Sequence, residues 1–320
     1  MNSWSIAQAN LTSVGVLTFI FGFLAARIKS DVRVPEAIYQ FLSIYLLFGI
    51  GLKGGHSLKS SSLSELAVPA LTTIACGILI PALAFYTLKL IKVLNDVDRG
   101  SIAAHYGSTS LVTFSAGLLF LESNNIFVEG FAPALLTLLE IPGLIVGIFL
   151  ASRSLTSKVS WAMTLKEVLL GKTVLLLAGG LVIGVITTNE GYTKVSPFFV
   201  ELLNGLLVLF LLHLGYMAGS NFSEIKKVGA PLAAFGILFP VISGLIGVTA
   251  GSLIGLSVGG ATMLGILSAS ASYIAAPAAV TVALPTASPT LALMSSIGIT
   301  FPFNLIVGIP IYFRIAELLG

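Results

Sequence analysis

Charge is the scarcest property of this 320-residue chain. Lys, Arg, Asp and Glu together make up 9% of its residues, whereas a typical soluble domain has about 25%. Apolar residues reach 56%, and the mean hydropathy is +1.04. This composition excludes a separate soluble domain of useful size. At about 20 residues per transmembrane helix, the chain has room for roughly ten spans with short connections, so we expect an all-α polytopic membrane protein.

Cysteine and recognisable catalytic motifs are scarce as well. Cys76 is the single cysteine, so the chain can form no intrachain disulfide and has no cysteine-based metal motif. The sequence contains no HExxH, no Walker loop and no cluster of Cys or His. We therefore expect neither an enzyme nor a bound cofactor. The net charge of +3 comes from basic loops and informs on membrane topology rather than on nucleic-acid binding.

Apolar runs separated by Gly, Pro, Ser or charged residues predict ten membrane spans. The first run has no basic segment and no small-residue cleavage site before it, so we interpret it as a retained helix rather than a signal peptide. The predicted spans are 8–27, 35–52, 65–91, 101–121, 130–152, 168–188, 196–218, 229–254, 259–283 and 290–314.

Basic residues are distributed unevenly between the two sides of these spans. The connections after spans 1, 3, 5 and 7 hold twelve Lys and Arg residues, against four on the opposite side. Because cytoplasmic loops are enriched in Lys and Arg, this bias predicts that both termini lie on the non-cytoplasmic side. The twelve are Arg27, Lys29, Arg33, Lys89, Lys92, Arg99, Arg153, Lys158, Lys166, Lys172, Lys226 and Lys227, and the four are Lys53, Lys59, Lys194 and Arg314.

Recurring features indicate an internal duplication. Four pairs of features recur in the same order at offsets of 159 to 162 residues. Each half, 1–158 and 159–320, would then hold five helices of one membrane domain. Because five is odd, the second half enters the membrane from the opposite side, as in the inverted repeats of secondary transporters. The pairs are residues 76–82 and 235–241, residues 143–153 and 304–314, Pro35 and Pro197, and Gly22 and Gly184.

Two serine-rich segments interrupt the fourth and ninth predicted spans. Residues 107–110 read Gly-Ser-Thr-Ser, and residues 268–272 read Ser-Ala-Ser-Ala-Ser before Pro277. A helix that breaks in the membrane exposes free N–H groups and about half a positive charge at its N-terminus, which suits a small anion. Freed carbonyls and the same hydroxyls would suit Na⁺. The alternative is that these small residues only allow helices to pack closely.

Glu140 is the most deeply placed charge in the chain, and Pro142 follows it closely. A carboxylate at the centre of a span costs about 2.5–3.5 kcal/mol on insertion scales, so it is a functional candidate by default. We expect Glu140 to hold the coupling cation or proton. The alternative is a protonated Glu140 bonded to the backbone of a neighbouring helix. Asn304, near the repeat position of Gly143, could line the same cavity, and Tyr273 could contact substrate or simply fill space.

The chain resembles the sodium-dependent bicarbonate transporter family, known best from the cyanobacterial high-affinity bicarbonate symporters. The resemblance covers nearly the whole chain. It rests on Gly-Leu-Lys-Gly-Gly at 51–55, Gly-Ser-Thr at 107–109, Glu-Ile-Pro-Gly-Leu at 140–144, Ala-Ser-Ala-Ser-Tyr-Ile-Ala-Ala-Pro at 269–277 and Pro-Thr-Ala-Ser-Pro-Thr at 285–290.

The resemblance implies a ten-helix fold of two inverted five-helix repeats, with helices four and nine broken. Helices 1, 2, 6 and 7 would form a scaffold and helices 3–5 and 8–10 a moving core. The anion and Na⁺ would bind where helices four and nine cross, and the protomers would form a homotrimer in the bacterial inner membrane. The candidate substrate-binding residues are Gly107, Ser108, Thr109, Ser110, Ser270, Ala271, Ser272 and Tyr273, and the candidate coupling-ion residues are Glu140, Ser268, Ser272 and Asn304.

This chain departs from the cyanobacterial pattern at two places. Those proteins have Asp after the serine run of helix nine, where this chain has Tyr273. They also carry a long hydrophilic insert between helices five and six, which is short here, and this weakens the expectation of a regulatory protein partner of the PII type. We expect Na⁺-coupled symport of bicarbonate or a similar small anion. The alternatives are symport of another organic anion by a core like that of the bile-acid symporters, and a non-transporting membrane sensor.

Overall fold

The computed structural model describes residues 8–59, 62–155, 159–227 and 229–320, and within these ranges the chain forms helices and no strand. Lys158, the last residue of the first predicted half, lies outside the described residues, and so do the side chains of Lys226 and Lys227. The α-helices are α2 Val14–Arg27, α3 Glu36–Leu58, α4 Leu63–Leu88, α5 Asp96–Gly107, α6 Leu111–Ser123, α7 Ala132–Ser152, α8 Trp161–Leu170, α9 Lys172–Ile186, α10 Asn189–Ser196, α11 Leu203–Ser220, α12 Phe222–Lys227, α13 Ala230–Leu253, α14 Val258–Ala269, α15 Ala275–Ala283, α16 Pro289–Ser295, α17 Phe301–Phe303 and α18 Ile309–Leu319. Three π-helical turns are η1 Pro197–Glu201, η2 Ser296–Thr300 and η3 Asn304–Gly308.

Six helices of the described chain are long and apolar enough to cross a membrane, and a seventh span results when α8 and α9, bent by 48°, are counted together. The chain is therefore a multi-pass membrane protein. The remaining three of the ten predicted spans are not single long helices. The first contains the 14-residue helix α2, and the fourth and ninth are each divided into two helices. By helix length and composition, the described chain thus supports six or seven of the ten predicted spans.

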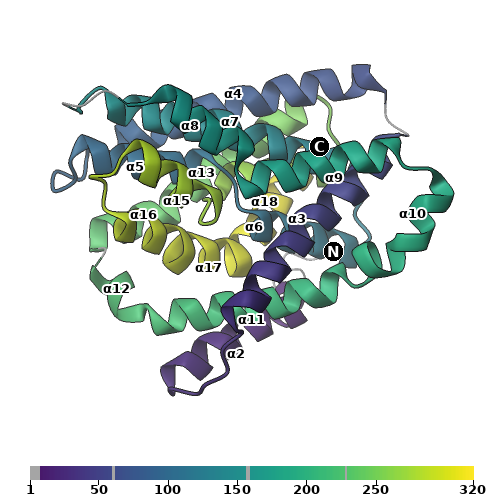
Figure 1. The fold of residues 1–320 in the computed structure, drawn as a ribbon, viewed down its shortest axis with the longest axis horizontal. Helices are drawn as coiled ribbons and strands as arrows, with labels where there is room; N and C mark the ends of the chain where they lie inside the picture. The colour runs from purple at the N-terminus through teal and green to yellow at the C-terminus, as the bar shows by residue number, and fades with distance from the viewer. Residues whose placement is uncertain (1–7, 60–61, 156–158, 228) are drawn as a thin grey trace.

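The helices pack in two groups, which we call group I and group II. Group I consists of α2, α3, α9 and α11, in which α2 packs along α11 and α3 along α9. Group II consists of α4, α5, α6, α7, α13, α14 and α18, in which α5 packs on α7 and α13 on α14. In Figure 1, α2 and α11 run side by side in the lower part of the molecule, whereas α4 and α7 lie at the top.

Glycines bring the paired helices of group I into backbone contact. A Cβ added at Gly22 of α2 would lie 2.2 Å from the carbonyl oxygen of Leu212 in α11, and one added at Gly184 of α9 would lie 2.4 Å from that of Leu52 in α3. Small residues permit such close approach in membrane helices. The two contacts correspond, because Gly184 follows Gly22 by 162 positions and Leu212 follows Leu52 by 160.

Among the described residues, polar contacts join group I and the turn before α2 to group II and η3, which leads into α18, at two places. Asn10, which precedes α2, donates from Nδ2 to the carbonyl oxygens of Leu305 and Ile306 in η3, both at 3.0 Å. Lys53 of α3 forms an ion pair with Glu122 of α6, with 2.7 Å between Nζ and Oε1. In η3 the N–H of Ile309 donates to the carbonyl oxygen of Asn304, and Pro310 has no N–H. The carbonyl of Leu305 therefore has no donor at i+4 or i+5 and can accept the bond from Asn10.

A cavity of about 520 Å³ lies between the two groups. It is lined by residues of α2 and α11 from group I, and by residues of α6, η3 and α18. Most of its lining is apolar, as at Phe120 and Ile309, and its polar side chains include Asn10 and Asn204. This open space between the groups therefore runs along α6, the helix that begins at the first break.

Candidate functional site

The first break separates α5 from α6. Helix α5 ends at Gly107, and Ser108 has an extended backbone with φ −88° and ψ 168°. Ser110 caps the next helix, because its Oγ accepts a hydrogen bond from the N–H of Thr113 at 3.2 Å. Serine is among the preferred residues at this position. The serine-rich sequence therefore ends one helix and starts the next within three residues.

The second break has the same local geometry. Helix α14 ends at Ala269, and Ser270 has φ −84° and ψ 163°, close to the values of Ser108. Ser272 Oγ accepts a hydrogen bond from the N–H of Ala276, in the first turn of α15, at 3.2 Å. Pro277 lies in that same turn, where its missing N–H costs no intrahelical hydrogen bond. Both predicted breaks are therefore present.

The two breaks contact each other directly. Ser270 Oγ lies 2.8 Å from Thr109 Oγ1 and accepts a hydrogen bond from the N–H of Ser110 at 3.0 Å. The N–H of Ser272 donates to the carbonyl oxygen of His105 at 2.7 Å. Each break thus satisfies part of the backbone that the other one leaves free, as buried polar groups in a membrane require.

Close packing fixes the backbone of the first break. A Cβ added at Gly143 of α7 would lie 1.8 Å from the carbonyl oxygen of Gly107, and one added at Gly107 would lie 2.5 Å from Cβ of Pro81 in α4. A side chain at either position would push α5 away from its neighbours. Gly107 therefore contributes no side chain to the site, and its small size lets α5 end in close contact with α4 and α7.

Glu140 of α7 lies beside the crossing of the breaks. Its side chain is 1% exposed, and neither carboxylate oxygen has a hydrogen-bond partner in the parts of the chain that the structure describes. A carboxylate buried without a partner carries a large desolvation penalty as an anion. Its charged form therefore requires a cation in contact with it, and its neutral form requires a proton.

A small space separates Glu140 from the breaks. Its volume is about 10 Å³, which is on the order of one water-sized particle. The two serine-rich segments and α7 contribute most of the polar lining, which is Thr109, Ser110, Glu140, Thr173, Ser272 and Tyr273. The structure thus brings together one carboxylate, several hydroxyls and the N-terminal ends of α6 and α15, whose partial positive charge attracts an anion.

The other residues of the two serine-rich segments are buried as well. Ser108 is fully buried and its Oγ has no hydrogen-bond partner among the described residues. Ala271 is also buried in the second break. The Tyr273 ring packs edge-on against Phe301, with 5.6 Å between the ring centroids and 69° between the planes. Its aromatic body therefore fills space next to the break, and the residue also lines the small cavity.

Two of the predicted coupling-ion residues lie elsewhere. Ser268 packs against α13, where a Cβ added at Gly247 would lie 2.4 Å from its Oγ. The amide of Asn304 has partners on both sides, because Nδ2 donates to the carbonyl oxygen of Ala269 and Oδ1 accepts from the Tyr312 hydroxyl, each at 2.8 Å. Neither residue contributes to the lining of the cavity beside Glu140.

Sequence patterns did not reveal two parts of the site. Thr173 of α9 lines the cavity, but it is an ordinary residue near the start of an apolar helix, and nothing around it marks it. The carbonyl oxygen of His105 receives the N–H of Ser272, a contact that no side-chain pattern can indicate. The His105 ring, in contrast, has a structural bond from Nδ1 to the carbonyl oxygen of Ser101 at 2.8 Å.

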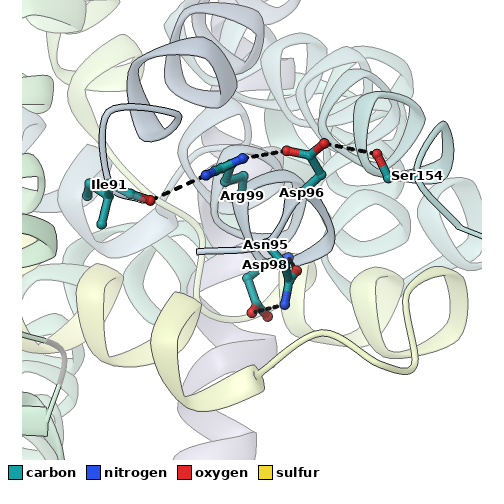
Figure 2. Close-up of polar contacts among 6 residues, drawn as sticks. All are labelled: Ile91, Asn95, Asp96, Asp98, Arg99 and Ser154. Atoms are coloured by element: carbon teal, nitrogen blue, oxygen red, sulfur yellow. Dashed lines mark hydrogen bonds and ion pairs between the residues drawn. The ribbon is translucent and has the colours of Figure 1, made fainter. Parts of the chain in front are cut away.

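Figure 2 shows the polar contacts that anchor the start of α5. Asp96 accepts hydrogen bonds from Arg99 at 2.6 Å and from Ser154, beyond the end of α7, at 3.0 Å. The hydrogen bond from Arg99 is the main cause that lowers the pKa of Asp96. Asp98 accepts the N–H of Ser288, just before α16, at 2.7 Å. These bonds fix α5, and hence the first break, to both halves of the chain.

The comparison with protein families matches residues 15–317 to the Na⁺-dependent bicarbonate transporter superfamily. The chain belongs to this family. As a member of the Na⁺-dependent bicarbonate transporter superfamily it is a membrane transporter, and the resemblance drawn from its motifs is confirmed. The match includes both helix breaks and Glu140. A search of curated proteins finds no match.

Proposed function

We propose that the chain is a Na⁺-coupled symporter of bicarbonate or a similarly small anion. The observation that supports this most strongly is the crossing of the two breaks beside Glu140, where Ser270 bonds to Thr109 and to the backbone of Ser110. Membership in the Na⁺-dependent bicarbonate transporter superfamily supports the same choice of substrate and ion. It also favours a transporter over an enzyme.

In this proposal the anion binds at the N-terminal ends of α6 and α15. The positive ends of the helix dipoles, with N–H groups of the first turns, neutralise its charge without a buried Lys or Arg. The hydroxyls at the crossing can donate to its oxygens. Because the space there holds about 10 Å³, the two breaks must separate slightly to admit an anion. The residues proposed to bind it are Ser108, Thr109, Ser110, Ser270, Ala271 and Ser272, with Gly107 and Tyr273 as the walls of the site.

The coupling cation occupies the space beside Glu140. Oxygen ligands are available from the carboxylate and from the hydroxyls of Ser272 and Thr109, which line the same space. One negative carboxylate balances one Na⁺, so the buried charge is neutral once the ion has entered. A Na⁺ at this point would also attract the anion, which explains physically why the two bind together. Ser268 and Asn304 take no part in this ligand set.

We propose the inverted five-plus-five repeat as the framework of this site. The equivalent glycine contacts of Gly22 and Gly184 with Leu212 and Leu52 support it, because a pseudo-two-fold axis exchanges such pairs. The basic loops support an orientation with both termini outside the cytoplasm. A homotrimer in the bacterial inner membrane follows from the resemblance alone.

Alternating access in this proposal is a movement of group II against group I. The cavity of about 520 Å³ between the groups supports this interpretation, as does the small number of polar contacts described between them. The contacts of Asn10 with η3 and of Lys53 with Glu122 would form in one state and break in the other. Group I would correspond to the scaffold that the resemblance implies, and group II to the moving core.

A second candidate is symport of a larger organic anion. The apolar lining of the 520 Å³ cavity along α6 favours it, because a larger substrate needs open apolar space next to the crossing. A bicarbonate ion has no apolar surface and gains nothing from such a lining.

Uptake of labelled bicarbonate into proteoliposomes tests the proposal. We expect uptake that rises at least tenfold when an inward Na⁺ gradient is imposed and that stays at the basal rate with an inward K⁺ gradient. Competition with unlabelled formate, acetate and taurocholate would rank the anions by size. Na⁺-dependent uptake of taurocholate without bicarbonate uptake would favour the second candidate, and the absence of uptake with any of these anions would favour a non-transporting sensor.

A further inference from the structure

A side-chain amide occupies the end of the helix that leads to the second break. Asn304 Nδ2 donates to the carbonyl oxygen of Ala269, the last residue of α14, at 2.8 Å. The last carbonyls of a helix have no partner within the helix. Asn304, Tyr312 and Ala269 are all buried, so water does not replace this donor. The amide therefore satisfies a carbonyl that would otherwise stand free beside the anion site.

Tyr312 determines which way this amide points. Its hydroxyl donates to Asn304 Oδ1 at 2.8 Å. If the amide turned over, Oδ1 would face the Ala269 carbonyl, and two acceptors would meet without a proton between them. The orientation with Nδ2 toward Ala269 is therefore the one in which all three groups are satisfied. Tyr312 acts on the break through Asn304 and does not itself contact α14's last carbonyl.

The hydrogen bond from Asn304 matters because the end of α14 is partly negative. The C-terminal end of a helix carries about half a negative charge on its free carbonyls, and Ala269 directly precedes Ser270, whose Oγ bonds to the first break. A free carbonyl here would repel the anion that the proposed function brings to the crossing. A hydrogen bond from Asn304 occupies one of the carbonyl's two lone pairs, offsets part of its negative charge and holds the end of α14 in place.

At the first break, the position equivalent to Asn304 holds a glycine, which has no side chain to donate a hydrogen bond. Gly143 corresponds to Asn304 in the repeat, 161 positions earlier, and it packs directly on the carbonyl oxygen of Gly107, where a Cβ would lie at 1.8 Å. Both positions therefore contact the last residue of the helix that precedes a break, Gly143 by packing and Asn304 by hydrogen bonding. In the proposed repeat this correspondence supports a role for Asn304 at the break, and Asn304 is not among the residues that line the cavity beside Glu140.

We infer that Asn304, oriented by Tyr312, is a positioning residue that binds the C-terminal carbonyl of α14 and shapes the anion site, and that it is not a ligand of the coupling cation. This inference rests on the proposed function for its consequence in transport. Its structural part concerns the end of α14 alone and can be measured without transport.

The test compares Asn304→Leu, Tyr312→Phe and the double variant with wild type in proteoliposomes. Tyr216→Phe is the matched control, because it removes a tyrosine hydroxyl that donates to a single backbone carbonyl, that of Ser30 at 3.2 Å, within group I. Bicarbonate uptake is measured at saturating Na⁺, and Na⁺ activation at saturating bicarbonate. Initial rates are normalised to the amount of folded protein.

We expect both single variants to raise the half-saturating bicarbonate concentration about three- to tenfold, the range for one hydrogen bond, with the maximal rate within about twofold of wild type. The double variant should be no worse than Asn304→Leu alone, because Tyr312 acts through Asn304. A rise confined to the half-saturating Na⁺ concentration in Asn304→Leu, with Tyr312→Phe unchanged, would identify Asn304 as a cation ligand and overturn the inference. Additive effects of the two substitutions would also overturn it.

Hydrogen–deuterium exchange of the purified proteins separates this inference from the proposed function. Amides at the end of α14 and in residues 270–273 should exchange at least about fivefold faster in Asn304→Leu and Tyr312→Phe than in wild type or Tyr216→Phe. Unchanged exchange would contradict the positioning role even if wild type transports bicarbonate. If the two variants exchanged faster than wild type but wild type showed no Na⁺-dependent uptake, the positioning role would stand and the proposed function would be rejected.

Discussion

Glu140→Gln is expected to abolish the Na⁺ dependence of uptake. Glutamine keeps the shape of the side chain but has no charge to balance a cation in a site where the carboxylate is buried without a protein partner. Removing one partner of a buried charge pair costs about 3–5 kcal/mol, which corresponds to a loss of at least about a hundredfold. Uptake with an inward Na⁺ gradient should therefore fall to the rate seen without one.

Glu190→Gln is the matched control for this variant. It makes the same chemical change at an 81% exposed side chain that pairs with Lys194 on the surface, where an ion pair contributes less than about 1 kcal/mol. It should keep wild-type uptake. If Glu140→Gln retained its response to Na⁺ while the protein remained folded, the coupling ion would have to bind elsewhere, and the ligand set proposed for it would be wrong.

Gly143→Ala is expected to inactivate the protein by displacing the first break. The added Cβ would lie 1.8 Å from the carbonyl oxygen of Gly107 and 2.1 Å from its carbonyl carbon. Both are backbone atoms, so relief requires α5 or α7 to move as a whole. Overpacking of this kind typically costs 1–3 kcal/mol, and a backbone collision places the substitution at about 3 kcal/mol or more. Uptake should drop below about a tenth of wild type, with a lower thermal unfolding midpoint.

Gly179→Ala provides the comparison, because a Cβ at this position of α9 meets nothing within 4 Å. Alanine is favoured over glycine inside a helix by about 0.5–1 kcal/mol, so this variant should unfold at the same temperature as wild type or slightly higher. Equal stability and uptake of Gly143→Ala and Gly179→Ala would show that the contact between α5 and α7 does not determine the geometry of the break.

The sequence alone predicts the two breaks well, for a physical reason. Serine residues compete with helix hydrogen bonds and cap the next helix, so the two serine-rich runs mark where α5 and α14 end. Glu140 is predictable for a similar reason, because a carboxylate in an apolar span needs a function or a partner. The recurrence of Gly22 as Gly184 also marks two positions where the structure has close helix contacts, α2 with α11 and α9 with α3.

Other features depend on tertiary contacts that no local pattern encodes. The bond from Asn304 to Ala269 joins residues 35 positions apart, so the local sequence around Asn304 predicts a polar group in the core and carries no sign of its partner. Thr173 reaches the cavity because α9 packs along α3 and beside α7. The sixth predicted span, 168–188, likewise misses the bend of 48° between α8 and α9 at Gly171, because α8 begins seven residues earlier, at Trp161.

The location of bound bicarbonate tests the central claim most directly. A structure determined by electron cryo-microscopy in the presence of Na⁺ and bicarbonate should show density between the N-terminal ends of α6 and α15, beside Glu140, that disappears when chloride replaces bicarbonate. Density confined to the apolar cavity near Asn10 and Asn204, with the crossing of the breaks still closed, would contradict the claim that these two helix ends hold the anion.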